Sequence, residues 1–136
     1  MPADAIAVVR SFIDAVNRRS VDDLSALMAD DHTFVDSQGH ALAGREQMAA
    51  AWRAYFAMFP DYEIRVDSIL ADGDRVALFG QASGTFNGKR GLVSENRIVM
   101  PAAWNAGVKD GRVAFWQVYC DWTEGMKIIE RENHEG

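Results

Sequence analysis

The sequence contains a single cysteine, Cys120, so no disulfide can form within the chain. A lone thiol is typical of proteins in a reducing compartment, which indicates a cytoplasmic location. No apolar run approaches the roughly 20 residues that a membrane-spanning helix needs. Asp4, Arg10 and Asp14 interrupt the N-terminal segment where a signal peptide would have its apolar centre. The sequence therefore predicts no association with a membrane.

Basic surface and metal-ligand motifs are also scarce. The 14 Lys and Arg residues are outnumbered by 20 Asp and Glu residues, which gives a net charge of -6. The only basic pairs, Arg18-Arg19 and Lys89-Arg90, are too short to form a nucleic-acid footprint. The three histidines lack the spacing of a metal-ligand set, and the glycine-rich segments lack phosphate-binding patterns. We therefore expect no metal, no cofactor and no nucleic-acid partner.

The first 60 residues have the periodicity of helices. Apolar residues recur at steps of three and four over 3–18 and over 44–59, and the second run stops at Pro60. Ser20 is suited to cap another helix between them, which would end at Asp30-Asp31. The apolar residues of these helices are Ile6, Val9, Ile13 and Val16, then Leu24, Leu27 and Met28, then Met48, Trp52, Tyr55, Phe56 and Phe59.

The rest of the chain has the pattern of strands. Apolar and polar residues alternate from Tyr62 onward, and Asp72-Gly73-Asp74 is typical of a hairpin turn. Helices followed by a meander of strands favour a single α+β domain over 1–136 with an antiparallel sheet. The expected segments are a short extended piece at 32–36 and a turn at 38–40, strands at 62–67, 75–83, 93–104 (interrupted or bulged by Pro101) and 112–122, turns or loops at 84–91 and 105–111, and a terminal helix at 123–132.

Carboxylates embedded in apolar sequence are the best candidates for chemistry. Asp36 follows Phe34 closely, and Asp121 lies between Cys120 and Trp122. A carboxylate among aromatic residues is desolvated, which raises its pKa and suits it to proton transfer. Each also has a structural alternative, because Asp36 could be a turn residue and Asp121 could cap the end of a strand at the surface.

A charged pair and several tryptophans are further candidates. Glu95 and Arg97 are two residues apart, which places them on one face of a strand, as an orienting pair or as a solvated one. Trp52, Trp104 and Trp116 are expected in the core or in the wall of a pocket rather than in a cofactor site.

Three segments carry a resemblance to a known superfamily. They are residues 12–31 (FIDAVNRRSVDDLSALMADD), 34–46 (FVDSQGHALAGRE) and 111–122 (GRVAFWQVYCDW). They resemble the nuclear transport factor 2-like superfamily, which is also called ketosteroid isomerase-like or SnoaL-like. The resemblance covers nearly the whole chain. It implies a cone in which a strongly curved sheet wraps around the N-terminal helices and encloses a pocket, and it implies a homodimer formed through the sheets.

Two branches of this superfamily place an acid/base aspartate differently. The ketosteroid isomerases are similar in having a base at the position of Asp36, but their two oxyanion donors fall at Phe12 and near Met100, which cannot donate. SnoaL-like polyketide cyclases need little more than one aspartate near the end of the last long strand, where Asp121 stands. The resemblance to the SnoaL-like cyclases therefore conflicts with fewer residues of this sequence than the resemblance to the ketosteroid isomerases does.

A third branch, the limonene-epoxide hydrolases, resembles the C-terminal part. Their water-activating aspartate matches Asp121 and their central arginine matches Arg97, but the acid expected next is Val99. Their water-positioning tyrosine and asparagine fall at Phe34 and Asp36. Half of that constellation is present, and Glu95 is the candidate substitute for the missing acid.

These observations predict an isomerase-like or cyclase-like enzyme that uses carboxylate acid/base catalysis on a small hydrophobic organic molecule. Asp121 would be the main proton shuttle with a raised pKa, Asp36 a second carboxylate and Arg97 an orienting charge. A non-catalytic ligand-binding domain, an epoxide hydrolase and a pure dimerisation or transport module are the alternatives. The residues expected to contact the ligand are Glu95, Trp104, Tyr119, Phe34, Trp52 and Phe56.

Overall fold

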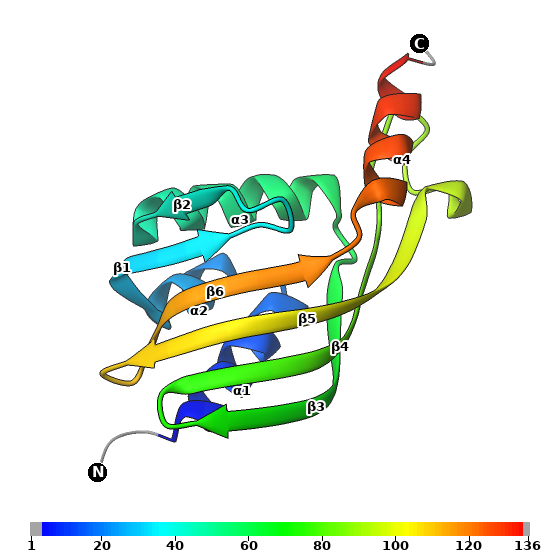
Figure 1. Ribbon diagram of the computed structural model, residues 1–136. Helices are drawn as coiled ribbons and strands as arrows, with labels where there is room; N and C mark the ends of the chain where they lie inside the picture. Colours follow the sequence, from blue (N-terminus) through cyan, green and yellow to red (C-terminus); the bar gives the residue numbers. More distant parts are fainter. Residues whose placement is uncertain (1–3, 135–136) are drawn as a thin grey trace.

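The computed structural model describes residues 4–134 as a curved six-stranded sheet with helices on one face (Figure 1). The strand order is β2-β1-β6-β5-β4-β3. All neighbours are antiparallel except β1 and β6, so the sheet is mixed rather than purely antiparallel. The elements are α1 (Ala5–Asn17), α2 (Val21–Ala26), β1 (Met28–Val35), β2 (Ala41–Ala43), α3 (Arg45–Met58), β3 (Glu63–Asp72), β4 (Arg75–Thr85), a 3₁₀ turn (Ser94–Asn96), β5 (Arg97–Lys109), β6 (Arg112–Cys120) and α4 (Thr123–His134).

The first helix forms where the apolar stripe predicts it. The Asp4 carboxylate accepts a hydrogen bond from the backbone N–H of Ile6 at 3.2 Å and so caps the helix. Val9, Phe12 and Val16 are fully buried against the sheet. The expected Ser20 cap is also present, because its hydroxyl accepts from the backbone N–H of Asp23 at 3.3 Å.

The end of the second helix differs from the prediction. Helix α2 stops at Ala26, and the chain enters β1 at Met28 instead of remaining helical to Asp31. The Leu27 carbonyl accepts a 2.7 Å hydrogen bond from the backbone N–H of Val113 in β6, and Met28 is fully buried. Pairing with β6 therefore overrides a helical spacing that the local sequence supports equally well.

The longest strand also differs from the prediction. Strand β5 begins at Arg97 and runs without interruption to Lys109, so the expected turn at 105–111 shrinks to Asp110-Gly111. Pro101 sits in unbroken register opposite Gln81, because β6 starts pairing with β5 only at Ala102. A proline is tolerated where a strand has a neighbour on one side only.

The helices and the curved sheet enclose the core. Side chains on the inner face of the three central strands are buried, and the bulges at Val66/Ser68 in β3 and Gly107/Val108 in β5 increase the local twist. Helix α4 stands at the end of the sheet where β6 finishes (Figure 1). None of the described helices is long and apolar enough to cross a membrane.

Candidate functional site

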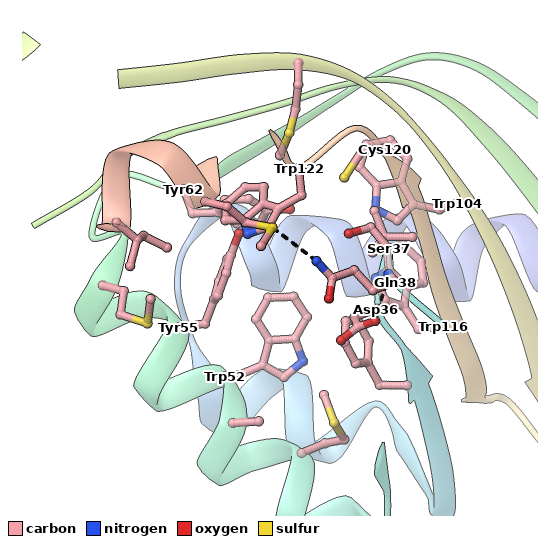
Figure 2. A pocket seen from close by; sticks show the side chains of 18 residues that line it. Asp36, Ser37, Gln38, Trp52, Tyr55, Tyr62, Trp104, Trp116, Cys120 and Trp122 are labelled. Carbon is pink, nitrogen blue, oxygen red and sulfur yellow. Dashed lines mark hydrogen bonds between the residues drawn. The ribbon is translucent and has the colours of Figure 1, made fainter. Parts of the chain in front are cut away.

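A pocket of about 400 Å³ opens between helix α3, the inner face of the sheet and helix α4. Its size is in the range of small-molecule sites. Its wall consists mostly of aromatic and methionine side chains, and the polar residues Asp36, Ser37 and Gln38 lie together on one side (Figure 2). The lining residues are Phe34, Asp36, Ser37, Gln38, Met48, Ala51, Trp52, Tyr55, Met58, Tyr62, Met100, Trp104, Trp116, Val118, Cys120, Trp122, Met126 and Ile129.

Four of the residues expected from the sequence meet in this pocket. Phe34 and Asp36 come from the end of β1, Trp52 from α3 and Trp104 from β5. Phe34 meets Trp52 edge to face at a centroid distance of 6.4 Å. Trp104 is 2% exposed and stacks near Trp116 at 6.3 Å, so it forms the floor of the pocket. Segments far apart in sequence thus converge on one cavity.

Asp36 is held by the turn that follows β1. Its Oδ1 accepts hydrogen bonds from the backbone N–H groups of Gln38 and His40, each at 2.9 Å, and its Oδ2 lies 3.4 Å from Nδ1 of His40. Partial burial raises the pKa of this carboxyl, but the two backbone bonds and His40 outweigh it and leave the pKa below its ordinary value. Asp36 is therefore ionised at neutral pH.

The expectation that Asp121 also faces the pocket is wrong. Asp121 is exposed, and its Oδ1 accepts from the backbone N–H of Thr123 at 3.0 Å and from the Thr123 hydroxyl, so it caps the start of α4. The Thr123 bonds lower the pKa of Asp121, which reverses the predicted rise. On β6 the residues Trp116, Val118 and Cys120 point inward, so Tyr119 and Asp121 fall on the other face.

The expected charged pair is also outside the pocket. Glu95 lies in the 3₁₀ turn before β5 rather than on a strand, and its Oε2 accepts from Nη1 of Arg90 at 3.0 Å. Arg97 starts β5 with its side chain 51% exposed, and its Nη1 lies 3.8 Å from Oδ2 of Asp61. The half-constellation that resembles an epoxide hydrolase is therefore not assembled around this pocket.

Two further residues that were expected to contact the ligand, Tyr119 and Phe56, do not line the pocket. Tyr119 is 50% exposed on the outer face of the sheet. Phe56 packs behind the wall on Trp52 at a centroid distance of 5.2 Å and does not reach the cavity. Both were expected in contact with ligand, and in this structure neither lines the pocket.

Sequence reasoning missed the polar residues that do line the pocket. Tyr55 extends from α3 and Tyr62 from the segment before β3, and neither hydroxyl forms a hydrogen bond with any other residue that the structure describes. Burial raises the pKa of both phenols, so they are protonated at any physiological pH. Cys120 lines the same pocket from the end of β6, and burial raises the pKa of its thiol. The alternation of Trp116 and Val118 along β6 is the sequence signal that could have indicated an inward Cys120.

Helix α4 closes one side of the pocket through Met126 and Ile129, together with Trp122 just before it. The Trp122 ring lies against Gly125, where an added Cβ would come within 2.7 Å of the ring. The Sδ of Met126 accepts a hydrogen bond from Nε2 of Gln38 at 3.2 Å, which joins the helix to the turn after β1 (Figure 2).

A polar network anchors the far end of this helix. The Glu132 carboxylate is buried and accepts from Nδ2 of Asn96 at 2.8 Å and from Nε of Arg90 at 3.1 Å. Arg131 donates to Oδ1 of Asn96 at 2.5 Å. These contacts fix α4 to the loop between β4 and β5 and thereby hold Trp122 over the pocket.

Within residues 4–134, no group of three or more His, Cys, Asp and Glu side chains could hold a metal ion. The titratable side chains that line the pocket are one carboxylate, two phenols and one thiol.

Comparison with solved structures shows the fold. A candidate polyketide cyclase from Xanthomonas campestris pv. campestris is 21% identical, with a TM-score of 0.81, and the match covers 92% of this chain and 96% of that one. An LEH-like epoxide hydrolase from M. tuberculosis is 22% identical, with a TM-score of 0.76 and coverage of 95% and 91%. A protein of ketosteroid isomerase-like fold from Catenulispora acidiphila, solved with trimethylamine, is 19% identical, with a TM-score of 0.75 and coverage of 93% and 92%.

The sequence comparisons are more specific about the family. No curated protein matches the chain. The model of the SnoaL-like domain matches residues 9–116, a stretch that begins in α1 and ends in β6. The resemblance read from the sequence is confirmed, and the chain belongs to the SnoaL-like domain family of the nuclear transport factor 2-like fold.

Proposed function

We propose that this protein is an acid/base enzyme of the isomerase or cyclase type, acting on a small, largely apolar organic molecule. The observation that carries the proposal is the position of Asp36. Among the described residues that line the pocket, it is the only charged side chain. Its lowered pKa keeps it ionised, as a base must be, and makes it a weaker base than the raised pKa expected from the sequence would have done. A carboxylate beside an apolar cavity can take a proton from a bound carbon acid.

The proposed step balances without a cofactor. Asp36 removes a proton from the carbon next to a carbonyl group, the C–H bond breaks, and its electron pair moves toward the carbonyl oxygen to give an enolate. In an isomerisation, the Asp36 carboxyl returns the proton to another carbon of the same molecule. In a cyclisation, the enolate carbon attacks a second carbonyl group, and the proton goes to the alkoxide that forms.

A non-catalytic ligand-binding domain is the second candidate, and one observation favours it. The two backbone hydrogen bonds accepted by Asp36 give this residue a structural role in the turn, independent of chemistry. The substitution Asp36→Asn separates the two functions, because an amide oxygen accepts the same backbone bonds but cannot take a proton.

The experiment is base-catalysed exchange of the protons next to the carbonyl of 2-tetralone, followed by NMR in heavy water. If Asp36 is the base, Asp36→Asn should slow exchange by roughly 10²–10⁴-fold, the usual contribution of a general base. Asp121→Asn is the matched control and should leave the rate unchanged. If only Asp121→Asn abolished exchange, Asp121 would be the base, as the sequence analysis predicted. No exchange by the wild type would favour the binding domain.

A further inference from the structure

The aromatic residues of this protein gather around one cavity. All four tryptophans of the chain line the pocket, together with two of its three tyrosines and Phe34. Figure 2 shows Trp52 and Tyr55 on one side of the cavity and Trp104 and Trp116 on the other. A wall that only had to be apolar could be built from Leu, Ile and Val, yet the described lining contains one Val and one Ile. A ligand in this pocket is therefore surrounded mainly by aromatic rings.

The rings are set at steep angles to one another, so they do not form a single stacked layer. Trp52 and Tyr55 are nearly perpendicular, at 89° with their centroids 6.1 Å apart, and Phe34 meets Trp52 at 64°. An aromatic ring carries negative charge on its two faces, and a cation within about 6 Å of the centroid is attracted to it. Several rings around one cavity make the kind of site that recognises alkylated ammonium groups.

The charges around the pocket have the same preference. Asp36 is ionised with 39% of its side chain exposed, and among the described residues no Lys, Arg or His lines the pocket with it. Its neighbour His40 is 76% exposed and does not line the cavity. The net charge of -6 adds a field that attracts cations over a longer range. An anion would enter without a counter-ion, whereas a cation finds a carboxylate at the wall.

We propose that the pocket binds a positively charged organic amine, with the aromatic rings around its tertiary or quaternary alkylammonium group and Asp36 as the counter-charge. The cavity of about 400 Å³ leaves room for a further apolar part of the ligand. Binding of the cation needs only the rings and the carboxylate and is independent of any reaction. Taken together with the proposed function, on which this last step rests, the substrates are ketones that carry such an amine.

The first test compares two probes of one shape. These are para-hydroxyphenyltrimethylammonium, which is a cation, and para-tert-butylphenol, in which a carbon atom replaces the nitrogen. Dissociation constants are measured by isothermal titration calorimetry near neutral pH. The cation should bind at least about 10-fold more tightly, because attraction to ring faces is strong where water is excluded. Equal binding, tighter binding of the phenol, or no binding of the cation at millimolar concentration would overturn the inference.

The second test weakens the rings with almost no change in their shape. Growth of the expression host on 5-fluorotryptophan replaces all four tryptophans, and all four line the pocket. Fluorine withdraws electron density from the ring face, so the cation should bind about 2- to 5-fold more weakly while the neutral phenol is unaffected. An equal loss for both probes, or no loss for the cation, would show that the rings do not recognise its charge and would refute the inference.

The third test removes the counter-charge. Asp36→Asn should weaken binding of the cation about 2- to 5-fold, the range of a partly exposed ion pair, and leave binding of the phenol unchanged. Asp121→Asn is the matched control, because it makes the same change in net charge at an exposed site outside the pocket. Equal losses in the two variants would mean that the net charge of the chain attracts the cation and that the pocket does not select it.

The outcomes distinguish this inference from the proposed function. Proton exchange that depends on Asp36, without any preference for the cationic probe, would refute the inference and leave the proposed function standing. A preference for the cation that the fluorinated protein loses, without exchange of ketone protons, would refute the proposed function and support the inference.

Discussion

His32 should make the protein sensitive to mild acid. Its ring is fully buried in β1, and its Nδ1 lies 2.7 Å from the carbonyl oxygen of Val113. A carbonyl oxygen can only accept, so Nδ1 carries the proton in the neutral ring. The other nitrogen, Nε2, is buried without a partner, and the ring stacks at 6.0 Å from Phe12. Protonating Nε2 would place a positive charge in this apolar contact.

The sign and size of the effect follow from linkage. Burial lowers the pKa of His32, although the bond to Val113 and the nearby Asp31 oppose the shift. The unfolded chain therefore takes up this proton near pH 6.5 while the folded chain does not, so stability falls as the pH drops below 6.5. The loss is up to about 1.4 kcal/mol for each pH unit, until the folded pKa is reached. The lowered carboxyl pKa values act in a separate window, at roughly pH 4 and below.

The assay is urea unfolding at several pH values between about 7 and 5.5. His32→Asn should flatten this pH dependence, because the Asn amide can still donate to Val113 but does not titrate. The variant is also less stable at every pH, since a smaller side chain leaves a cavity. His134→Asn is the control, as this side chain is 78% exposed. Equal slopes in the wild type and in His32→Asn would refute the reasoning.

Three other outcomes are expected. Trp104→Ala should lower the free energy of unfolding by about 3–5 kcal/mol in denaturant titrations, because it removes a buried ring from the pocket floor; a loss below 1 kcal/mol would mean that the pocket collapses around the gap. Glu132→Gln should lower the melting temperature and speed thiol labelling of Cys120, because Arg90 loses its anionic partner and α4 is held less firmly; unchanged labelling would contradict the anchoring role of this network. We also propose that the sheet pairs with a second copy through its outer face, where Phe79 and Leu70 are exposed; Phe79→Lys should convert a dimer into a 15.1 kDa monomer in light scattering, and a monomeric wild type would contradict the pairing.

Local patterns were sufficient to predict where α1, α3 and the β3–β4 hairpin lie, but not where α2 ends. The stripe through Val9 and Val16 and the cap at Ser20 act within a few residues of each other, so the sequence expresses them directly. The turn at Asp72-Gly73-Asp74 is of the same kind, with Gly73 at a φ of +59°. Elements of this sort require no knowledge of the rest of the chain.

Elements that depend on a distant partner were predicted incorrectly. Met28 continues the helical spacing of α2, yet it lies in β1, where it pairs with Val113 of β6. Gly107 is a residue type common in turns, yet it lies in β5, where it pairs with Phe115 of β6. Gly107 lies opposite Phe115, where an added Cβ would come within 3.3 Å of the Phe115 Cβ. The glycine at this position therefore leaves room for the Phe115 side chain on the neighbouring strand and does not mark a turn.

The pocket shows the same division. The sequence by itself determined that carboxylates and aromatic residues cluster near the ends of β1 and β6. The enclosed cavity was implied by the resemblance to the superfamily. Only the tertiary structure decided which of them face inward, because strand parity and the start of α4 turn Asp121 outward while the turn after β1 leaves Asp36 at the wall. The two phenols come from a helix and a loop whose sequences carry no sign of the sheet they face. Their position in the wall of the pocket depends on the curvature of that sheet, which is a property of the whole chain and not of any short segment.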